Sequence, residues 1–131
     1  MATVFTGVIM PKATQSTAIT VSTTTQELDP NGAFEIIITS SSGADVATLP
    51  TPTAYISKIE RSGAKGDPKV TVGQLLLITH GTDGGSTFEI TYPNLAGTSK
   101  TATTADAGDT LLLVAGTSGY AILENTGFTI A

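Results

Sequence analysis

Residues 108–123 read GDTLLLVAGTSGYAIL, and this stretch indicates the fold class. The glycine-bounded turn Gly116-Thr117-Ser118-Gly119 separates the apolar run 111–114 from the β-forming residues 120–123, and both stretches are too short for an ordinary helix. Short runs of β-forming residues on either side of such a turn are typical of a β-hairpin. We therefore expect two paired strands, one over residues 110–115 and one over residues 120–123.

Two more apolar runs lie upstream, at residues 36–38 (Ile-Ile-Ile) and 75–78 (Leu-Leu-Leu-Ile). Consecutive residues of a strand point to opposite faces, so these runs place apolar side chains on both faces. A sandwich covers only one face of each sheet. Loops or other subunits must then cover the second faces, and we favour other subunits, in an oligomer of threefold or similar symmetry.

The rest of the chain adds shorter strand patterns separated by turn residues. We expect a tight hairpin turn at 81–85, a turn at 29–32, and a loop with a brief edge strand in 94–107. The sequence thus predicts an all-β fold: a single-domain antiparallel β-sandwich or jelly-roll-like barrel of about 8–10 short strands. The other expected strands cover residues 18–23, 33–39, 46–49, 55–60, 69–72, 87–92 and 128–131.

The 131 residues fit one domain, which we place at 18–131. Residues 1–17 form either an N-terminal edge strand or an extended arm that lies on a partner. Their apolar side chains need cover from somewhere, and they are the candidate partner-binding residues: Val4, Phe5, Val8, Ile9 and Met10.

Charge and composition exclude several classes of partner. Only 13% of the residues are charged and the net charge is −5, which argues against binding nucleic acid. The basic residues between Lys58 and Lys69 are interspersed with acids and indicate a solvated loop rather than a phosphate-binding patch. The chain has no cysteine, no apolar run near the roughly 18 residues that span a bilayer, and no secretory signal at its start.

The candidate catalytic residues are sparse. His80 is the single histidine, and neither Ser86 nor Asp83 nearby belongs to a nucleophile-elbow pattern. We expect His80 on the surface beside the 81–85 turn, and we expect the protein not to be an enzyme.

Acidic side chains give no clear site either. The carboxylates that a glycosidase would pair are scattered (Glu27, Asp29, Glu35, Glu60, Glu89 and Glu124), and the chain has no tryptophan for sugar stacking. Asp83, Asp106 and Asp109 match turn chemistry better than a calcium loop. We therefore expect no catalytic, cofactor-binding or metal-binding residues.

With these residues in view, the chain resembles small β-domains of tailed-bacteriophage structural proteins, especially head decoration (cement) proteins. Related domains often carry Trp at the position of Tyr120. The resemblance covers roughly residues 18–131. It is carried by Thr23-Thr24-Thr25 with Leu28, Gly32 before residues 34–38, Ala47-Thr48-Leu49-Pro50, residues 108–114, the Gly-Thr-Ser-Gly turn, residues 120–123, and Asn125-Thr126-Gly127.

The resemblance implies a homotrimer that is made in the host cytoplasm and sits on the outer surface of the virion capsid. There it would bridge neighbouring major capsid proteins and stabilise the shell without contacting nucleic acid or membrane. The same module resembles parts of tail fibres and appendages, which implies an alternative: a domain that binds a receptor or a glycan. In that case the loops 81–85, 94–107 and 116–119 would form a pocket at one end of the sandwich.

Overall fold

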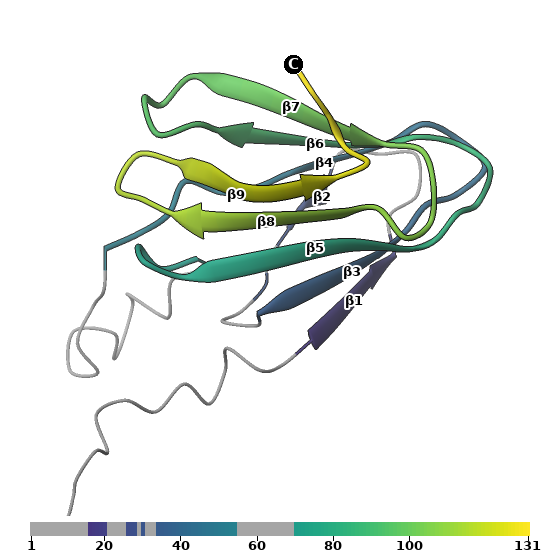
Figure 1. Ribbon diagram of the computed structural model, residues 1–131, viewed down its shortest axis with the longest axis horizontal. Coiled ribbons are helices and arrows are strands. Elements are labelled where there is room, and N and C mark those ends of the chain that lie inside the picture. The colour runs from purple at the N-terminus through teal and green to yellow at the C-terminus, as the bar shows by residue number, and fades with distance from the viewer. Residues whose placement is uncertain (1–15, 21–25, 29, 31–33, 55–69) are drawn as a thin grey trace, which may run out of the picture.

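The computed structural model describes residues 16–20, 26–28, 30, 34–54 and 70–131 (Figure 1). Within these residues the chain forms ten strands and no helix. The strands are β1 (Ser16–Thr20), β2 (Gln26–Glu27), β3 (Glu35–Thr39), β4 (Asp45–Thr48), β5 (Leu75–Thr82), β6 (Phe88–Pro93), β7 (Ser99–Thr104), β8 (Thr110–Ala115), β9 (Tyr120–Thr126) and β10 (Thr129–Ile130).

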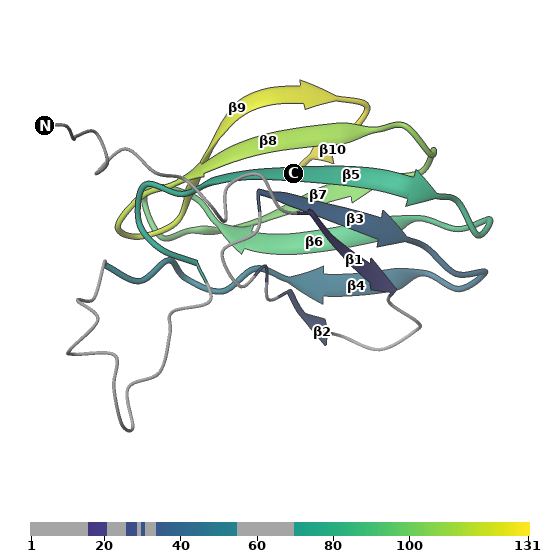
Figure 2. The ribbon, with the colours of Figure 1, turned by 90° about the horizontal axis from the view of Figure 1, so that it is seen from below.

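The strands form two sheets that pack face to face, as Figure 2 shows. Sheet A has the order β1-β3-β5-β8-β9, and sheet B has the order β10-β7-β6-β4-β2. The all-β sandwich that the sequence predicts is therefore confirmed. The two sheets remain separate and do not close into the barrel that we kept as an alternative.

The first six strands pair in parallel, which corrects the expectation of a wholly antiparallel sandwich. Odd-numbered strands β1, β3 and β5 lie in sheet A, and β2, β4 and β6 lie in sheet B. The pairs β1–β3, β3–β5, β2–β4 and β4–β6 are all parallel. The chain therefore crosses to the opposite sheet after each strand and returns in the same direction, like successive turns of a flattened coil.

From β6 onward the pairing is antiparallel. β6 and β7 form one hairpin, β8 pairs with β5 and with β9, and β10 pairs with β7. The turn at 116–119 does join a hairpin, as expected, with Gly116 N–H donating to Gly119 O at 2.7 Å. The 81–85 turn does not, because β5 and β6 lie in different sheets. β7 is also a full strand inside sheet B rather than the brief edge strand expected in 94–107.

The connections that cross between the sheets stack on each other. The link from β3 to β4 lies on the link from β5 to β6: Ser40 N–H donates to Thr82 O at 2.9 Å, and Asp45 N–H donates to Thr87 O at 3.1 Å. At Gly84 a Cβ atom would overlap the backbone of Ser40 and Ser41. A residue without a side chain is therefore required for the two links to approach this closely.

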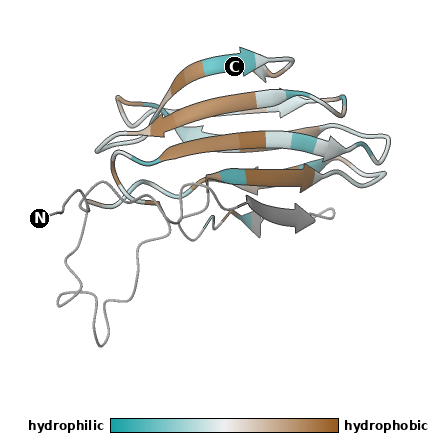
Figure 3. Ribbon diagram, turned by 60° about the horizontal axis from the view of Figure 1, so that its bottom comes forward, coloured by the Kyte–Doolittle hydropathy of each residue, from teal (hydrophilic) through white to brown (hydrophobic). Residues whose placement is uncertain are grey.

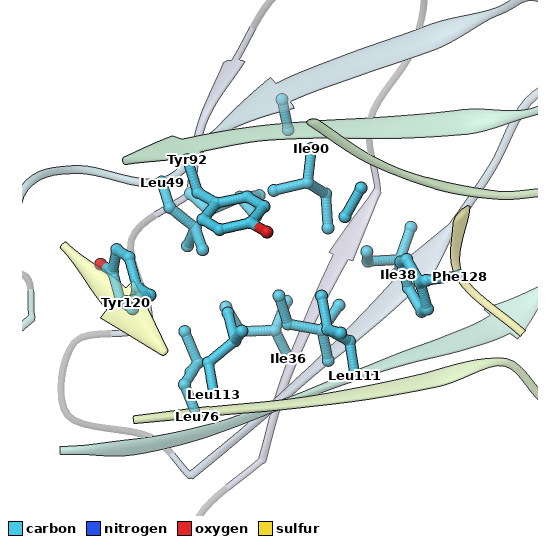
Figure 4. Close-up of a cluster of buried hydrophobic side chains, with 14 of the residues drawn as sticks. Ile36, Ile38, Leu49, Leu76, Ile90, Tyr92, Leu111, Leu113, Tyr120 and Phe128 are labelled. Atoms are coloured by element: carbon cyan, nitrogen blue, oxygen red, sulfur yellow. The ribbon is translucent and has the colours of Figure 1, made fainter. Parts of the chain in front are cut away.

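The core fills the space between the sheets (Figure 4). Alternate residues of each long strand point inward, so β3, β5 and β8 contribute the buried members of the three apolar runs. Burying each large aliphatic or aromatic side chain stabilises the fold by about 1.5–3 kcal/mol. The largest fully buried apolar side chains are Tyr120, Phe88, Leu28, Ile36, Ile38, Leu76, Ile78, Ile90, Leu111 and Leu113.

Some sequence predictions fall on or beside residues that the structure does not describe. The strand expected at 55–60 lies outside the described residues, and in the segment 70–72 only Thr71 pairs, through a single parallel bridge to Thr53. β1 begins at residue 16, two residues before the expected domain boundary, and is one edge of sheet A. No helix within the described residues is long and apolar enough to cross a membrane.

The alternation in β6 gives a matched test of the inward and outward faces. Ile90→Ala removes a fully buried side chain, so we expect the free energy of unfolding to fall by about 2–5 kcal/mol. Thr91→Ala, one residue later on the outer face, should change it by less than about 1 kcal/mol. Urea unfolding of both variants measures the difference, and equal losses would contradict the assignment of faces.

Candidate functional site

The three apolar runs of the sequence meet in one sheet. They form β3, β5 and β8, which are neighbours in sheet A. Their inward members are buried, and their outward members lie on the other face of the sheet, half-buried or exposed. We call this outward set the apolar outer face: Ile37, Leu75, Leu77, Leu112 and Val114, with Leu123 of β9 beside them.

Strand register places these outward side chains in rows. Leu75 pairs with Val114, which pairs with Ala121, and Leu77 pairs with Leu112. Leu75 is 43% exposed. Cross-strand neighbours are close enough for their side chains to touch, so Leu75, Leu77, Leu112 and Val114 form a continuous surface. Ile37 lies opposite Thr79, in the next row along the sheet. In Figure 3 the hydrophobic residues of β5 and β8, inward and outward alike, colour bands along the two strands.

The apolar outer face is bounded by polar groups. Toward the other end of sheet A, β5 continues with Thr79, whose hydroxyl donates to Glu35 Oε2 at 2.8 Å. At the β9 edge, Glu124 pairs with Leu112. The register places Glu35 opposite Leu77 and Glu124 opposite Leu112, so a carboxylate stands at each end of the Leu77–Leu112 row.

The outer face of sheet B is different. Its outward residues are mostly threonines, with Thr48, Thr91 and Thr101 in one cross-strand row. The neighbouring row contains Glu89 opposite Thr103. Threonine is common on a pleated surface that stays wet, so sheet B presents the ordinary solvent-facing side of a sandwich.

β9 combines apolar exposure with an irregular edge. The β8–β9 register shifts between Leu112 and Leu113, which leaves Leu123 as the extra residue of a β-bulge. Leu123 is 55% exposed and Ile122 is 37% exposed. Ile122 lies opposite the inward-facing Leu113 and so belongs to the inner face of the sheet, whereas Leu123 is the exposed apolar residue of the bulge.

His80 lies in the core, so the expectation of a surface histidine is wrong. It belongs to β5, two residues after the buried Ile78, and its side chain has no exposed area. The period-two alternation through Leu76, Ile78 and His80 was the sequence signal for burial. The glycine-rich turn next to His80 was the signal that misled, because it suggested that the strand ends there, whereas β5 extends two residues past His80.

Both ring nitrogens of His80 have partners inside the protein. Nδ1 lies 3.0 Å from Thr104 Oγ1 of β7, and Nε2 lies 3.1 Å from Ser40 Oγ. Thr104 in turn donates to Asp109 Oδ2 at 2.6 Å, and Gly84 N–H donates to Ser40 Oγ at 2.9 Å. A hydrogen-bonded chain therefore runs from Asp109 to Gly84 and joins the two sheets.

The hydrogen-bond donors at the two ends determine which atom donates at each step of this hydrogen-bonded chain. Because the Thr104 hydroxyl gives its proton to Asp109, its oxygen must accept from His80 Nδ1–H. Ser40 Oγ accepts from Gly84, and its own proton points to His80 Nε2, which is nearer than the other acceptor, Thr82 O at 3.5 Å. The ring thus carries its proton on Nδ1 and accepts at Nε2.

The chain contains a serine, a histidine and a carboxylate, the residue types of a hydrolytic triad. Ser40 is only 4% exposed and its oxygen is already engaged by Gly84, so a substrate carbonyl cannot approach it. Ser86 and Asp83, the neighbours weighed from the sequence, are not the partners of His80. The geometry supports a structural role for this network within the core.

The scattered acids stay apart. Glu35 lies on the outer face of sheet A and Glu89 on that of sheet B, while Asp29 and Glu60 lie outside the described residues. Asp83 accepts from Gly85 N–H at 2.7 Å, as turn chemistry predicts, whereas the Asp109 carboxylate accepts from Thr104. No group of three or more potential metal ligands occurs among the described residues.

The three loops proposed for a glycan pocket do not share one end of the sandwich. The turns at 94–98 and 116–119 do meet, with an isolated bridge between Asn94 and Tyr120. The 81–85 turn follows the other end of β5, where it stacks on the backbone of Ser40. Residues 94–107 reach from one end to the other because β7 lies within them.

The end that carries the 94–98 and 116–119 turns is closed by Tyr120. Its hydroxyl donates to Pro50 O at 2.7 Å. Burial raises the pKa of this phenol well above its usual range, and the nearby negative charge of Glu27 raises it further. Beside it, a shallow pocket of about 190 Å³ is lined by Leu49, Tyr92 and several hydroxyl groups.

The candidate partner-binding residues Val4, Phe5, Val8, Ile9 and Met10 lie outside the described residues. Their assignment stays a prediction. The surface that sequence reasoning anticipated only in part is the apolar outer face. The apolar runs indicated strands with apolar side chains on both faces, but only the sheet topology brings the outward residues together.

The hydrogen-bonded chain gives a stability prediction. Thr104→Val leaves the Asp109 carboxylate and His80 Nδ1–H without their shared partner, so we expect a loss of about 1–3 kcal/mol in the free energy of unfolding. Thr103→Val, on the outer face of the same strand, should change it by less than about 0.5 kcal/mol.

A double-mutant cycle of His80→Ala and Thr104→Val should show coupling of about 0.5–3 kcal/mol, measured by urea unfolding. Strict additivity of the two losses would contradict the hydrogen-bonded chain. Nitrogen NMR of the imidazole provides a second check, because the proton should be found on Nδ1.

No family model, no curated protein and no solved structure matches this chain. What the protein does must therefore be inferred from its own residues and their arrangement.

Proposed function

We propose that this chain is a structural protein of a bacteriophage virion, which binds the outside of the capsid as a homotrimer and bridges neighbouring major capsid proteins. The observation that carries the proposal is the apolar outer face of sheet A. It offers leucine and valine side chains to another protein surface, on a sandwich whose opposite face is rich in threonine.

The chemistry of the site fits packing better than catalysis. Within the part of the chain that the structure describes, His80 and Ser40, the histidine and serine that are hydrogen-bonded to each other, make these bonds inside the core. The leucine and valine side chains on the outer face of sheet A would contribute free energy through burial, at roughly 25 cal/mol for each Å² removed from water. Binding of this kind is how a protein reinforces a shell without consuming a substrate.

Stabilisation of a capsid would follow from geometry. A trimer presents three equal footprints, and once one is bound the other two bind at high effective concentration. Capsomers that are bridged in this way cannot separate until several contacts are lost together. The phage assignment itself comes from the resemblance of residues 18–131 to decoration proteins.

The alternative, a receptor- or glycan-binding appendage domain, has less support. The loops that would have built its pocket lie at both ends of the sandwich. The shallow pocket beside Tyr92 is flanked by Thr48 and Thr91 and has no charged lining residue. We therefore keep capsid decoration as the proposed function.

The test uses expanded heads of the phage that encodes this chain, with and without the purified protein. We expect the protein to co-sediment with the heads and to raise the temperature at which they burst, because bridged capsomers must lose the added interface first. Head integrity is followed by light scattering during heating. Heads that bind the protein and burst at an unchanged temperature would refute the stabilising role.

A further inference from the structure

We infer that the Asp83–Gly84 peptide is a site of covalent modification, at which the aspartate rearranges to isoaspartate when the link between β5 and β6 lifts from Ser40. The inference goes beyond the proposed function, because it concerns the chemistry of the backbone and not the partner that the protein binds. Asp83 is followed by glycine, and no other aspartate in the sequence is. Because glycine has no side chain, its backbone nitrogen is uncrowded and can attack the carboxyl group of the residue before it.

The reaction needs no partner other than water. The Gly84 nitrogen forms a bond to Asp83 Cγ, and one carboxyl oxygen leaves as water with the carboxyl proton and the proton of the nitrogen, which closes an imide ring. Water then opens the ring at either of its carbonyl groups. Breaking the new bond to Cγ restores aspartate. Breaking the original peptide bond leaves a chain that continues through Cγ, which is isoaspartate, with the same mass and one more methylene group in the backbone.

The structure brings the reacting groups together in one turn. Asp83 is exposed, so water reaches its carboxyl group. Its Oδ1 accepts from Gly85 N–H at 2.7 Å, which folds the side chain back along the residues that follow it. This Asx turn keeps the carboxyl group close to the intervening Gly84 nitrogen. The nucleophile and the electrophile are therefore neighbours before any opening occurs.

The stacking of the two links holds the reaction back. Gly84 N–H, which must lose its proton, donates to Ser40 Oγ at 2.9 Å, and this oxygen lies 3.1 Å from His80 Nε2 in the core. The backbone of Ser40 and Ser41 lies so close that even a Cβ atom at Gly84 would overlap it. A peptide held in this way cannot rotate to close a ring. The reaction rate should therefore follow the fraction of molecules in which the link has opened locally.

Isoaspartate would make the opening permanent. Its additional methylene group lengthens the backbone beside Gly84, where the contact with Ser40 leaves no space for one further atom. Gly84 N–H could not return to Ser40 Oγ, and the hydrogen-bonded chain through His80 would lose the donor at that end. The modification therefore converts a transient opening into a lasting loss of the contact between the two links.

The experiment follows the reaction in water that carries heavy oxygen, because each passage through the imide leaves one solvent oxygen at residue 83. Mass spectrometry of the peptide that contains residue 83 measures this label, and chromatography separates its isoaspartyl form. Ser40→Ala removes the acceptor of Gly84 N–H. This variant should take up the label about three- to tenfold faster than the unmodified protein, which is the factor that the loss of one hydrogen bond implies.

Two control variants separate the contact from general destabilisation. Ile90→Ala removes a buried side chain away from the links, and it should take up the label at about the rate of the unmodified protein. Asp83→Glu keeps the charge but would need a larger ring, so its label should not rise above background. A comparison without any substitution uses the unmodified protein in urea, which should react at least about tenfold faster than the folded protein.

Three results would overturn the inference. The first is a folded Ser40→Ala variant that takes up the label no faster than the unmodified protein. The second is an Ile90→Ala variant that matches Ser40→Ala, because the route would then be global unfolding. The third is a folded protein that reacts as fast as the protein in urea. None of these results bears on binding to capsids, so the proposed function depends on its own test.

Discussion

The stacking of one inter-sheet link on the next is the constraint on which the rest of this fold depends. Ser40 is central to it: its N–H pairs with the following link, and its hydroxyl joins Gly84 to His80. Parallel strands need a crossover connection, and in this fold each crossover passes through the opposite sheet, so each turn of the coil must match the one beneath it. The requirement for glycine at position 84 and the burial of His80 both follow from that match.

The same constraint creates the surface on which the proposed function rests. Winding places β3 next to β5, and the antiparallel return of β8 adds the third apolar run on the other side of β5. Three runs that are far apart in the sequence thus share one sheet. Their inward residues make the core, and their outward residues make an apolar face that is far larger than any one run would produce.

Local features of the fold could be predicted from the sequence because they depend on neighbouring residues. Thr110–Ala115 forms the expected strand to the residue, and the turn before Tyr120 closes the expected hairpin. The parallel pairing could not be predicted, since a glycine-rich link between two strands has the same composition whether the strands pair or separate into different sheets. The 81–85 segment is the clearest case, because the hairpin pattern is present and the hairpin is not.

In the candidate site, too, local features could be predicted from the sequence and the contacts between distant segments could not. The sequence indicated apolar residues on both faces of the strands, and the structure adds which of them are neighbours. For His80, the period-two alternation along β5 indicated burial, but the nearby glycine-rich turn led to the prediction of a surface position. Its partners Ser40, Thr104 and Asp109 come from three different segments, so only the assembled sheets bring them together.

The bulge at Leu123 has a consequence for behaviour at high concentration. Exposed sheet edges can recruit further copies into fibrils, and a bulge spoils the regular backbone ladder that such growth copies. Within the described residues, both edges of sheet B are two-residue strands and the β9 edge of sheet A is bulged, while β1 is a regular five-residue edge. Open-ended polymerisation of this protein is therefore hindered at three of the four sheet edges, which favours closed assemblies over fibres.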